Sequence, residues 1–101
     1  MRPKKYTFPE WLIKFSAHAR KRCRERNIDE NDVVNSVAKA IENIKAKVEN
    51  SESVFIRNKE YSVVVTKNSD SQVDIITVID KADAAKKLDE KEINTFQNPR
   101  L

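Results

Sequence analysis

The 101-residue sequence contains no glycine. Glycine lets a backbone turn tightly around a phosphate, so its absence excludes the glycine-rich loops of the Walker and Rossmann nucleotide-binding enzymes. Where the chain needs a left-handed backbone conformation, another residue has to adopt it, and asparagine tolerates that conformation. Asn27 is therefore predicted to end a helix in the basic segment that precedes it.

That basic segment spans residues 15–28 and holds the only histidine, together with five Lys and Arg residues within seven positions. Ser16 is predicted to cap a helix over residues 17–26, because its side-chain oxygen can accept a hydrogen bond from the first turn. Residues four apart share a face of a helix. The segment therefore has two neighbouring rows of side chains. The polar row consists of His18, Arg22 and Arg26, and the apolar row consists of Phe15, Ala19 and Cys23.

The polar row has the chemistry of a phosphate site. Arginine presents a planar fork that matches phosphate oxygens, and it keeps its charge at any working pH. Histidine can transfer protons near neutral pH. The competing interpretation is a solvated basic face with a histidine that is structural or merely exposed.

Charge and composition narrow the class of partner. Residues 1–26 carry a net charge of +7, whereas the remaining 75 residues carry −3. This asymmetry favours a polyanionic partner, nucleic acid before membrane. The sequence has no apolar run long enough to span a membrane and no signal peptide, and its single cysteine fits a reducing compartment. One histidine and one cysteine cannot form a zinc site by themselves, and we expect no metal and no cofactor.

The hydrophobic pattern predicts two helices before any strand. Residues 9–14 are predicted to form a short helix or turn that begins at Pro9. Trp11 would pack in the core or act as a lid, and the alternative is that it serves as a platform on which a base stacks. After the basic helix, Asp29 is predicted to cap a second helix over residues 30–47, because apolar residues recur there at helical spacing.

Three segments rich in β-branched and aromatic residues follow, at 53–57, 60–66 and 72–79. A two-residue turn at Asn58-Lys59 and a polar loop over 67–71 would join them into an antiparallel meander. In the third strand, Val73, Ile75, Thr77 and Ile79 are expected to share one face. The predicted fold is thus α+β, one domain over 1–101, with N-terminal helices packed on an antiparallel sheet of three to four strands. Its core spans about 9–80, and 81–101 is a charged tail with a further helix as one option.

The sequence also resembles a known group. The pattern Phe15-Ser16-x-His18-Ala19-x-x-Arg22-x-x-x-Arg26-x-Ile28, then Asp-Glu-x-Asp-Val-Val and later Ile75-Ile76-Thr77-Val78, resembles a family of small bacterial domains of formerly unassigned function. That family looks related to the BrnT toxins and to the barnase/EndoU/colicin/RelE-like group of ribonuclease toxins. The resemblance covers residues 15–79.

The resemblance implies metal-independent RNA cleavage, in which the ribose 2′-OH attacks the adjacent phosphate. His18 would be the general base or acid, Arg22 and Arg26 would stabilise the transition state, and Thr77 would bind the phosphate, although Thr77 is also an ordinary strand residue. Weaker candidates for the site are Arg57 and Tyr61. The residues that would contact the RNA backbone are Lys5, Arg20, Lys21 and Arg24.

Three functions stay open at this point. The first is a ribonuclease toxin, with tRNA as the favoured substrate, either in a toxin–antitoxin pair or as the C-terminal domain of a larger effector delivered into another cell's cytoplasm. An acidic antitoxin or immunity protein would then cover residues 15–26. The second is a non-catalytic basic module that binds nucleic acid. The third is a regulator that has kept the toxin fold without its activity.

Overall fold

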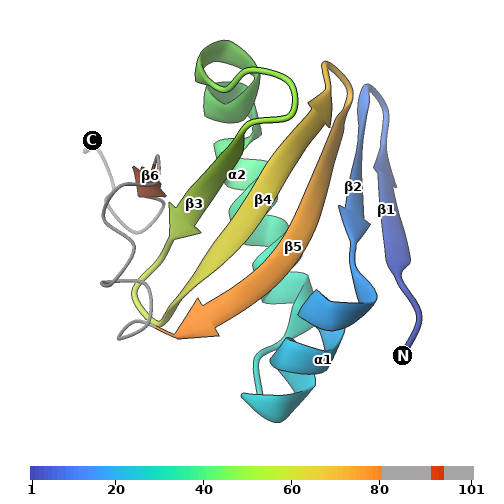
Figure 1. Cartoon of the computed structure of the whole chain (residues 1–101), viewed down its shortest axis with the longest axis vertical. Coiled ribbons are helices and arrows are strands. Elements are labelled where there is room, and N and C mark those ends of the chain that lie inside the picture. The colour runs from blue at the N-terminus through green and yellow to red at the C-terminus, as the bar shows by residue number, and fades with distance from the viewer. Residues whose placement is uncertain (81–91, 95–101) are drawn as a thin grey trace.

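The chain folds into two helices and a mixed β-sheet, so the predicted α+β class is confirmed. The structure is a computed structural model, which describes residues 1–80 and 92–94. Helix α2 lies behind the sheet, while the opposite face is turned toward the viewer in Figure 1. We call these the helical face and the front face. The elements in chain order are β1 (Lys4–Phe8), β2 (Trp11–Phe15), α1 (Ala17–Glu25), α2 (Glu30–Lys47), β3 (Ser53–Arg57), β4 (Tyr61–Ser69), β5 (Gln72–Asp80) and β6 (Glu92–Asn94).

The predicted meander is confirmed, because β3 pairs with β4 and β4 with β5, both antiparallel. The prediction of a purely antiparallel sheet of three to four strands is wrong. Strand β2 joins β5 in parallel and the short β6 joins β3 in parallel, which gives the order β1-β2-β5-β4-β3-β6. Residues 67–69 of the predicted polar loop belong to β4.

The main error concerns the first fifteen residues. The predicted short helix or turn at 9–14 is a β-hairpin, in which β1 and β2 pair and only Pro9 and Glu10 form the turn. Pro9 fits the first turn of a helix, but it also fits a tight turn between strands. The hairpin is held by aromatic side chains, because Phe8 stacks on Trp11 with ring centroids 4.1 Å apart. Trp11 is thus a packing residue of the sheet and lies partly buried against the core.

Both helices begin and end where the local sequence signals predicted. The Ser16 side chain accepts a hydrogen bond from the Ala19 backbone N–H, and the Asp29 side chain accepts one from Asn31. Asn27 takes a φ of 59°, so asparagine does supply the left-handed conformation that ends the first helix. The separation of the helices by a few residues lets each turn an apolar face toward the sheet.

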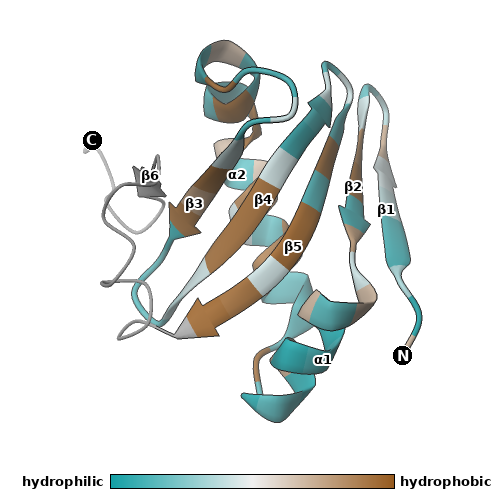
Figure 2. Ribbon diagram, viewed as in Figure 1, coloured by the Kyte–Doolittle hydropathy of each residue, from teal (hydrophilic) through white to brown (hydrophobic). Residues whose placement is uncertain are grey.

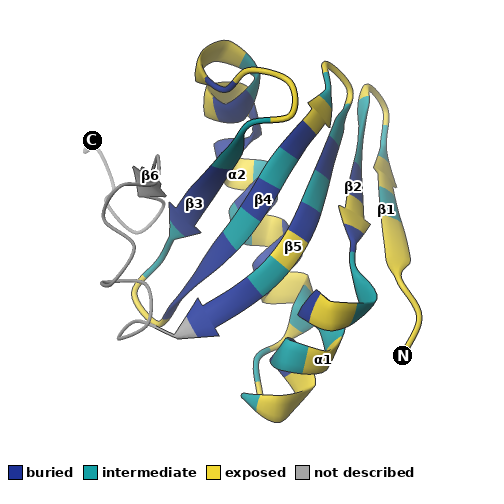
Figure 3. Ribbon diagram, in the orientation of Figure 1, coloured by how far each residue is buried: buried dark blue, intermediate teal, exposed yellow. Residues whose placement is uncertain are grey.

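The core lies between the helices and the helical face of the sheet. Ala19 and Cys23 of α1 are buried, as predicted for the apolar row. The buried residues of α2 repeat every three or four positions, which confirms its predicted apolar stripe. They are Val33, Val34, Val37, Ala40, Ile41 and Ile44. Figure 3 shows that buried positions dominate the central strands, whereas β1 and much of α1 are exposed.

A β-bulge changes which residues of β5 share a face. Val65 of β4 pairs with Ile75, but the next pair is Val64 with Thr77, so Ile76 is an extra residue. The predicted single face of β5 is therefore wrong. Val73 and Ile75 enter the helical-face core together with Val78. Thr77 and Ile79 lie on the front face instead, because side chains alternate on either side of the bulge.

Two further predictions concern the ends of the core. The predicted tail begins at residue 81, and nearly all of it, including the optional extra helix, falls outside the described residues. The sheet begins before the predicted core of about 9–80, since its first strand starts at Lys4, within the predicted domain of 1–101. In the part of the chain that the structure describes, neither helix combines the length and the apolar character needed to cross a lipid bilayer.

Candidate functional site

The N-terminus of α1 is attached directly to β5. The Ser16 backbone N–H donates to the Ile75 carbonyl at 3.1 Å, and the Ser16 hydroxyl donates to the Ile76 carbonyl at 3.0 Å. The same hydroxyl oxygen accepts from Ala19, so it caps the helix and joins it to the bulge at once. The first turn of α1 is therefore fixed against one point of the sheet.

His18 and Thr77 both lie beside this attachment point. His18 follows Ser16 by two residues, and Thr77 follows Ile76 by one, so their backbones start from the same pair of hydrogen bonds. The His18 side chain is exposed, while Thr77 is half-buried on the front face. Sequence spacing placed His18 on a helix and Thr77 on a strand, and the structure brings the two segments together.

Arg22 continues the row from His18 by one helical turn, about 6 Å along the axis. Its guanidinium Nη1 lies 3.7 Å from a Glu25 carboxylate oxygen. Its Nε is buried and has no hydrogen-bond partner within the described residues. Arg22 is thus half-buried, with a donor turned inward and a long, partly exposed ion pair at its tip.

Arg26 lies a further turn along the row, about 12 Å from His18. It lines a pocket of about 460 Å³ together with Glu25, Glu60 and Tyr61. Two carboxylates in that lining make the surroundings of Arg26 more acidic than those of His18. The row is therefore continuous in space, but its two ends have different neighbours.

The opposite flank of α1 is occupied by structural contacts. The Arg20 Nε donates to both Glu30 carboxylate oxygens at 3.1 Å, and its Nη1 donates to the Arg2 carbonyl at 2.8 Å. This ion pair holds α1 against the start of α2. Arg20 was predicted to contact RNA, and the structure places its guanidinium in an intramolecular pair. Lys21 and Arg24, the other predicted contacts on this helix, are exposed.

Two more predicted residues share the front face with Thr77. Arg57 ends β3 and pairs with Ser62, which in turn pairs with Ile79. Lys5 lies on β1, where the neighbouring Tyr6 packs on the core and so turns Lys5 to the front. Ser62 was not predicted, yet its hydroxyl is buried and without a hydrogen-bond partner in residues 1–80 and 92–94. A single serine in a strand gives no sequence signal that its hydroxyl will be buried without a hydrogen-bond partner.

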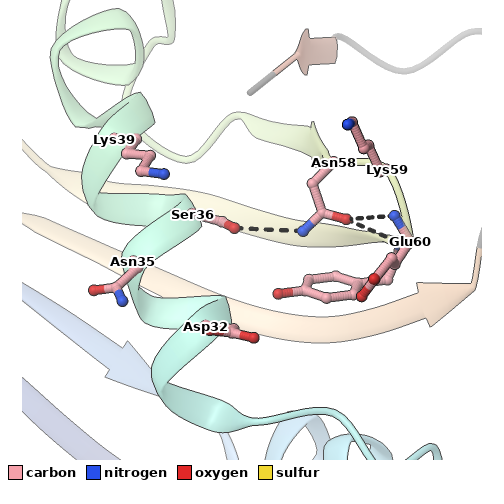
Figure 4. Close-up of a pocket in the computed structure, with 8 residues that line it drawn as sticks. Asp32, Asn35, Ser36, Lys39, Asn58, Lys59 and Glu60 are labelled. Carbon is pink, nitrogen blue, oxygen red and sulfur yellow. Dashed lines mark hydrogen bonds between the residues drawn. The ribbon is translucent and has the colours of Figure 1, made fainter. Parts of the chain in front are cut away.

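Tyr61 lies elsewhere. Tyr61 is buried in the core on the helical face, and it is one of the residues that line a polar pocket of about 340 Å³. Figure 4 shows this pocket between Asp32, Asn35, Ser36 and Lys39 of α2 and the turn that joins β3 to β4. Burial raises the pKa of the Tyr61 phenol, although hydrogen bonds with Asn58 and Ser36 act in the opposite direction. In the turn itself, wider than the predicted two residues, the Asn58 side chain accepts from the backbone N–H of Glu60 and of Tyr61. Tyr61 therefore supports the turn and does not share the front face with Thr77.

The single cysteine, Cys23, is buried in the core, and this burial raises the pKa of its thiol to about 11. A protonated, buried thiol is unreactive at neutral pH. Among the described residues there is no group of three His, Cys, Asp or Glu side chains that could hold a metal ion. The chemistry available near the α1 attachment point is thus that of an imidazole, guanidiniums and hydroxyls.

Comparison with known proteins adds a family but no activity. A search of curated proteins found no match, and neither did a search of solved structures. One family model does match, over residues 15–80, which include α1, α2 and the three strands of the meander. The matched region begins just before Ser16 and ends with β5, so it contains both segments of the attachment point. The chain therefore belongs to the family described as a domain of unknown function, DUF4258.

Proposed function

We propose that this chain is a metal-independent endoribonuclease whose toxic activity is neutralised by a cognate antitoxin or immunity protein. The observation that carries the proposal is the attachment of α1 to β5 through Ser16, which brings the segments of His18 and Thr77 together. The resemblance to the barnase/EndoU/colicin/RelE-like ribonucleases, which includes both residues, points to the same chemistry. The basic first quarter of the chain supports RNA as the substrate.

The reaction transfers a phosphoryl group within the RNA. The ribose 2′-oxygen forms a bond to the adjacent phosphorus, and the bond from phosphorus to the 5′-oxygen of the next nucleotide breaks. The 2′-OH loses a proton and the departing 5′-oxygen gains one, which leaves a cyclic phosphate and a 5′-OH. His18 carries out one of these proton transfers, as general base or acid.

The remaining residues stabilise and position the phosphate. Arg22, one turn from His18, stabilises the negative charge that grows on the phosphate oxygens, and Arg26 extends the same row. The Arg22 guanidinium supports this role, because its side chain is partly exposed and its Nη1 lies as far as 3.7 Å from the Glu25 carboxylate, a weak contact that a phosphate can replace. Thr77 donates a hydrogen bond to the phosphate or holds it in place.

The test is cleavage of total tRNA and of a generic mRNA, with and without EDTA, followed by analysis of the new ends. We expect discrete cuts that resist EDTA and end in a cyclic phosphate. His18→Ala should lower the rate by about 10²–10⁴-fold, the range for loss of a general acid or base. Lys59→Ala is the control, because Lys59 is an exposed charge in the turn between β3 and β4, outside the candidate site. Intact RNA with the wild-type protein, also when ribosomes are present, would refute the proposal.

A non-catalytic nucleic-acid-binding module is the second candidate. It is favoured by the exposed His18 imidazole, which makes no hydrogen bond to any described residue that would orient it. A binding module should tolerate His18→Ala and lose affinity with arginine or lysine replacements in a salt-dependent way. Binding that is unchanged in His18→Ala, with no cleavage by either protein, would select this candidate.

The proposed inhibitor is an acidic protein that covers residues 15–26, where the positive charge of the chain is densest. We propose cytoplasmic tRNA as the target. Activity within a toxin–antitoxin pair and activity as the terminal domain of a larger effector fit the same chemistry.

A further inference from the structure

The N-terminal hairpin places two lysines directly opposite each other. Lys5 of β1 and Lys14 of β2 are paired in the antiparallel register, and both are exposed. Their neighbours along the strands, Tyr6, Ile13 and Phe15, pack on the core of the helical face. Because side chains alternate along a strand, both lysines project from the front face.

This pair is electrostatically unfavourable in the isolated protein. Like charges directly opposite on neighbouring strands repel, with Cβ atoms about 4.5–5.5 Å apart. Neither lysine forms an ion pair or a hydrogen bond with any residue in the described part of the chain. The carboxylate beside Lys14 in the sheet register, Asp74, accepts hydrogen bonds from Asn68 and Gln72, at 2.9 and 2.8 Å. Asp74 keeps its negative charge, because both of its donors are neutral amides, but it forms no ion pair with Lys14, so the double charge of the pair is offset only in part.

The lysine pair is also close to the attachment point of α1. Lys14 precedes Ser16 by two residues, which is about 7 Å along an extended chain. Thr77 lies on the same face of the adjacent strand β5. Figure 2 shows the hydrophilic residues of β1 and α1 at one side of the sheet, beside the more hydrophobic β4 and β5.

We propose that Lys5 and Lys14 together bind a backbone phosphate of the RNA next to the phosphate that reacts beside His18. The proposal rests on the ribonuclease function proposed above. Lysine ammoniums act as point charges, so the pair would hold the RNA backbone without reading its sequence. The substrate strand would then run from the α1 row across β2 to β1, over the front face. A bound phosphate would also relieve the repulsion between the two lysines.

The experiment measures binding of a short 2′-O-methyl RNA, which cannot be cleaved, by the full chain at several salt concentrations. The variant is the double replacement Lys5→Gln and Lys14→Gln. Its control is Lys4→Gln with Lys59→Gln, which removes the same charge from β1 and the β3–β4 turn. Lys4 lies over the Tyr6 ring, on the other face of β1. We expect about tenfold weaker binding and a salt slope smaller by about 0.7 for each phosphate that the variant no longer neutralises, whereas the control changes little.

Equal binding by the variant and the control would overturn the proposal. A thermal midpoint of the variant well below that of the control would also overturn it, because the lysines would then be structural. The two proposals fail separately. If RNA binding depends on the pair but no RNA is cut, the nuclease fails and the pair stands as a polyanion site. If cleavage needs His18 while the variant binds RNA as the control does, the nuclease stands and the pair fails.

Discussion

The helical face of the sheet is filled by apolar side chains that two helices cover, whereas the front face carries lysines, hydroxyls and a small apolar cluster. That cluster consists of Phe55 and Ile79 with Val64 packed beside them. No helix of the described residues lies on the front face (Figure 1). The two faces thus show a division between stability and exposed charge. The helical face supplies the stability of the fold, so the front face and the adjoining row of α1 are free to carry charges that would destabilise a core.

Two neighbouring isoleucines test this division most strongly. Ile75 is fully buried in the helical-face core, while Ile76, the bulge residue, is 41% exposed. Ile75→Ala should lower the free energy of unfolding by about 2–5 kcal/mol, because it leaves a cavity in packed surroundings. Ile76→Ala should change it by less than about 0.5 kcal/mol. Urea unfolding of both variants measures the contrast, and similar losses at the two positions would contradict it.

The bulge between these residues also explains how far sequence patterns reach. Helical spacing predicted the buried stripe of α2, because each helix buries one face whatever strand it meets. Strand alternation predicted the wrong partners for Thr77, because one extra residue reverses every side chain that follows it. The hairpin was missed because Pro9 suits both a helix start and a strand turn. The sequence pattern that indicates the hairpin is the alternation of aromatic residues with Lys5 and Lys14 along the two strands.

A pH titration tests whether water reaches the buried Cys23 thiol on the helical face. Burial raises the pKa of Cys23 to about 11 from an ordinary value of 9.0. As the pH rises above 9, the unfolded chain loses the thiol proton while the folded chain keeps it. The stabilisation is therefore complete below pH 9 and falls by roughly 2–3 kcal/mol by pH 11. The difference in unfolding free energy between wild type and Cys23→Ala, measured from pH 8 to 11, isolates this effect from other titrating groups. A difference that stays constant over this range would mean that water reaches the thiol.

Lys67 is the polar exception on the helical face. It is 6% exposed, and its Nζ donates to the Val48 carbonyl at 2.9 Å and to the Lys45 carbonyl at 3.2 Å, at the end of α2. Lys67→Met keeps the apolar stem but removes both hydrogen bonds, which should cost about 1–2 kcal/mol. The exposed Lys59→Met serves as control. Equal stability of the two variants would show that these hydrogen bonds contribute little.

The candidate site was predictable where it depends on one helix and unpredictable where it depends on distant partners. Spacing of four placed His18 and Arg22 in one row, since that relation is local. No local pattern could assign Arg20 to Glu30, because the pairing depends on how α1 turns into α2. The attachment of Ser16 to β5 spans 60 positions and arises only when the parallel strands β2 and β5 meet.

The smallest expected effect on stability comes from comparing the two flanks of α1, one with the Arg20–Glu30 pair and the other with the row of His18 and Arg22. The Arg20–Glu30 pair is about one-quarter exposed, so solvent screens it, and a double-mutant cycle with Arg20→Gln and Glu30→Gln should give a coupling of about 0.2–1 kcal/mol. RNA cleavage by Arg20→Gln should stay close to wild type, while Arg22→Gln should lower it strongly with little loss of stability. If Arg20→Gln instead abolished cleavage without changing the unfolding free energy, the catalytic flank would be the one that faces α2. In that case the row of His18 and Arg22 would have to be reassigned as a solvated face.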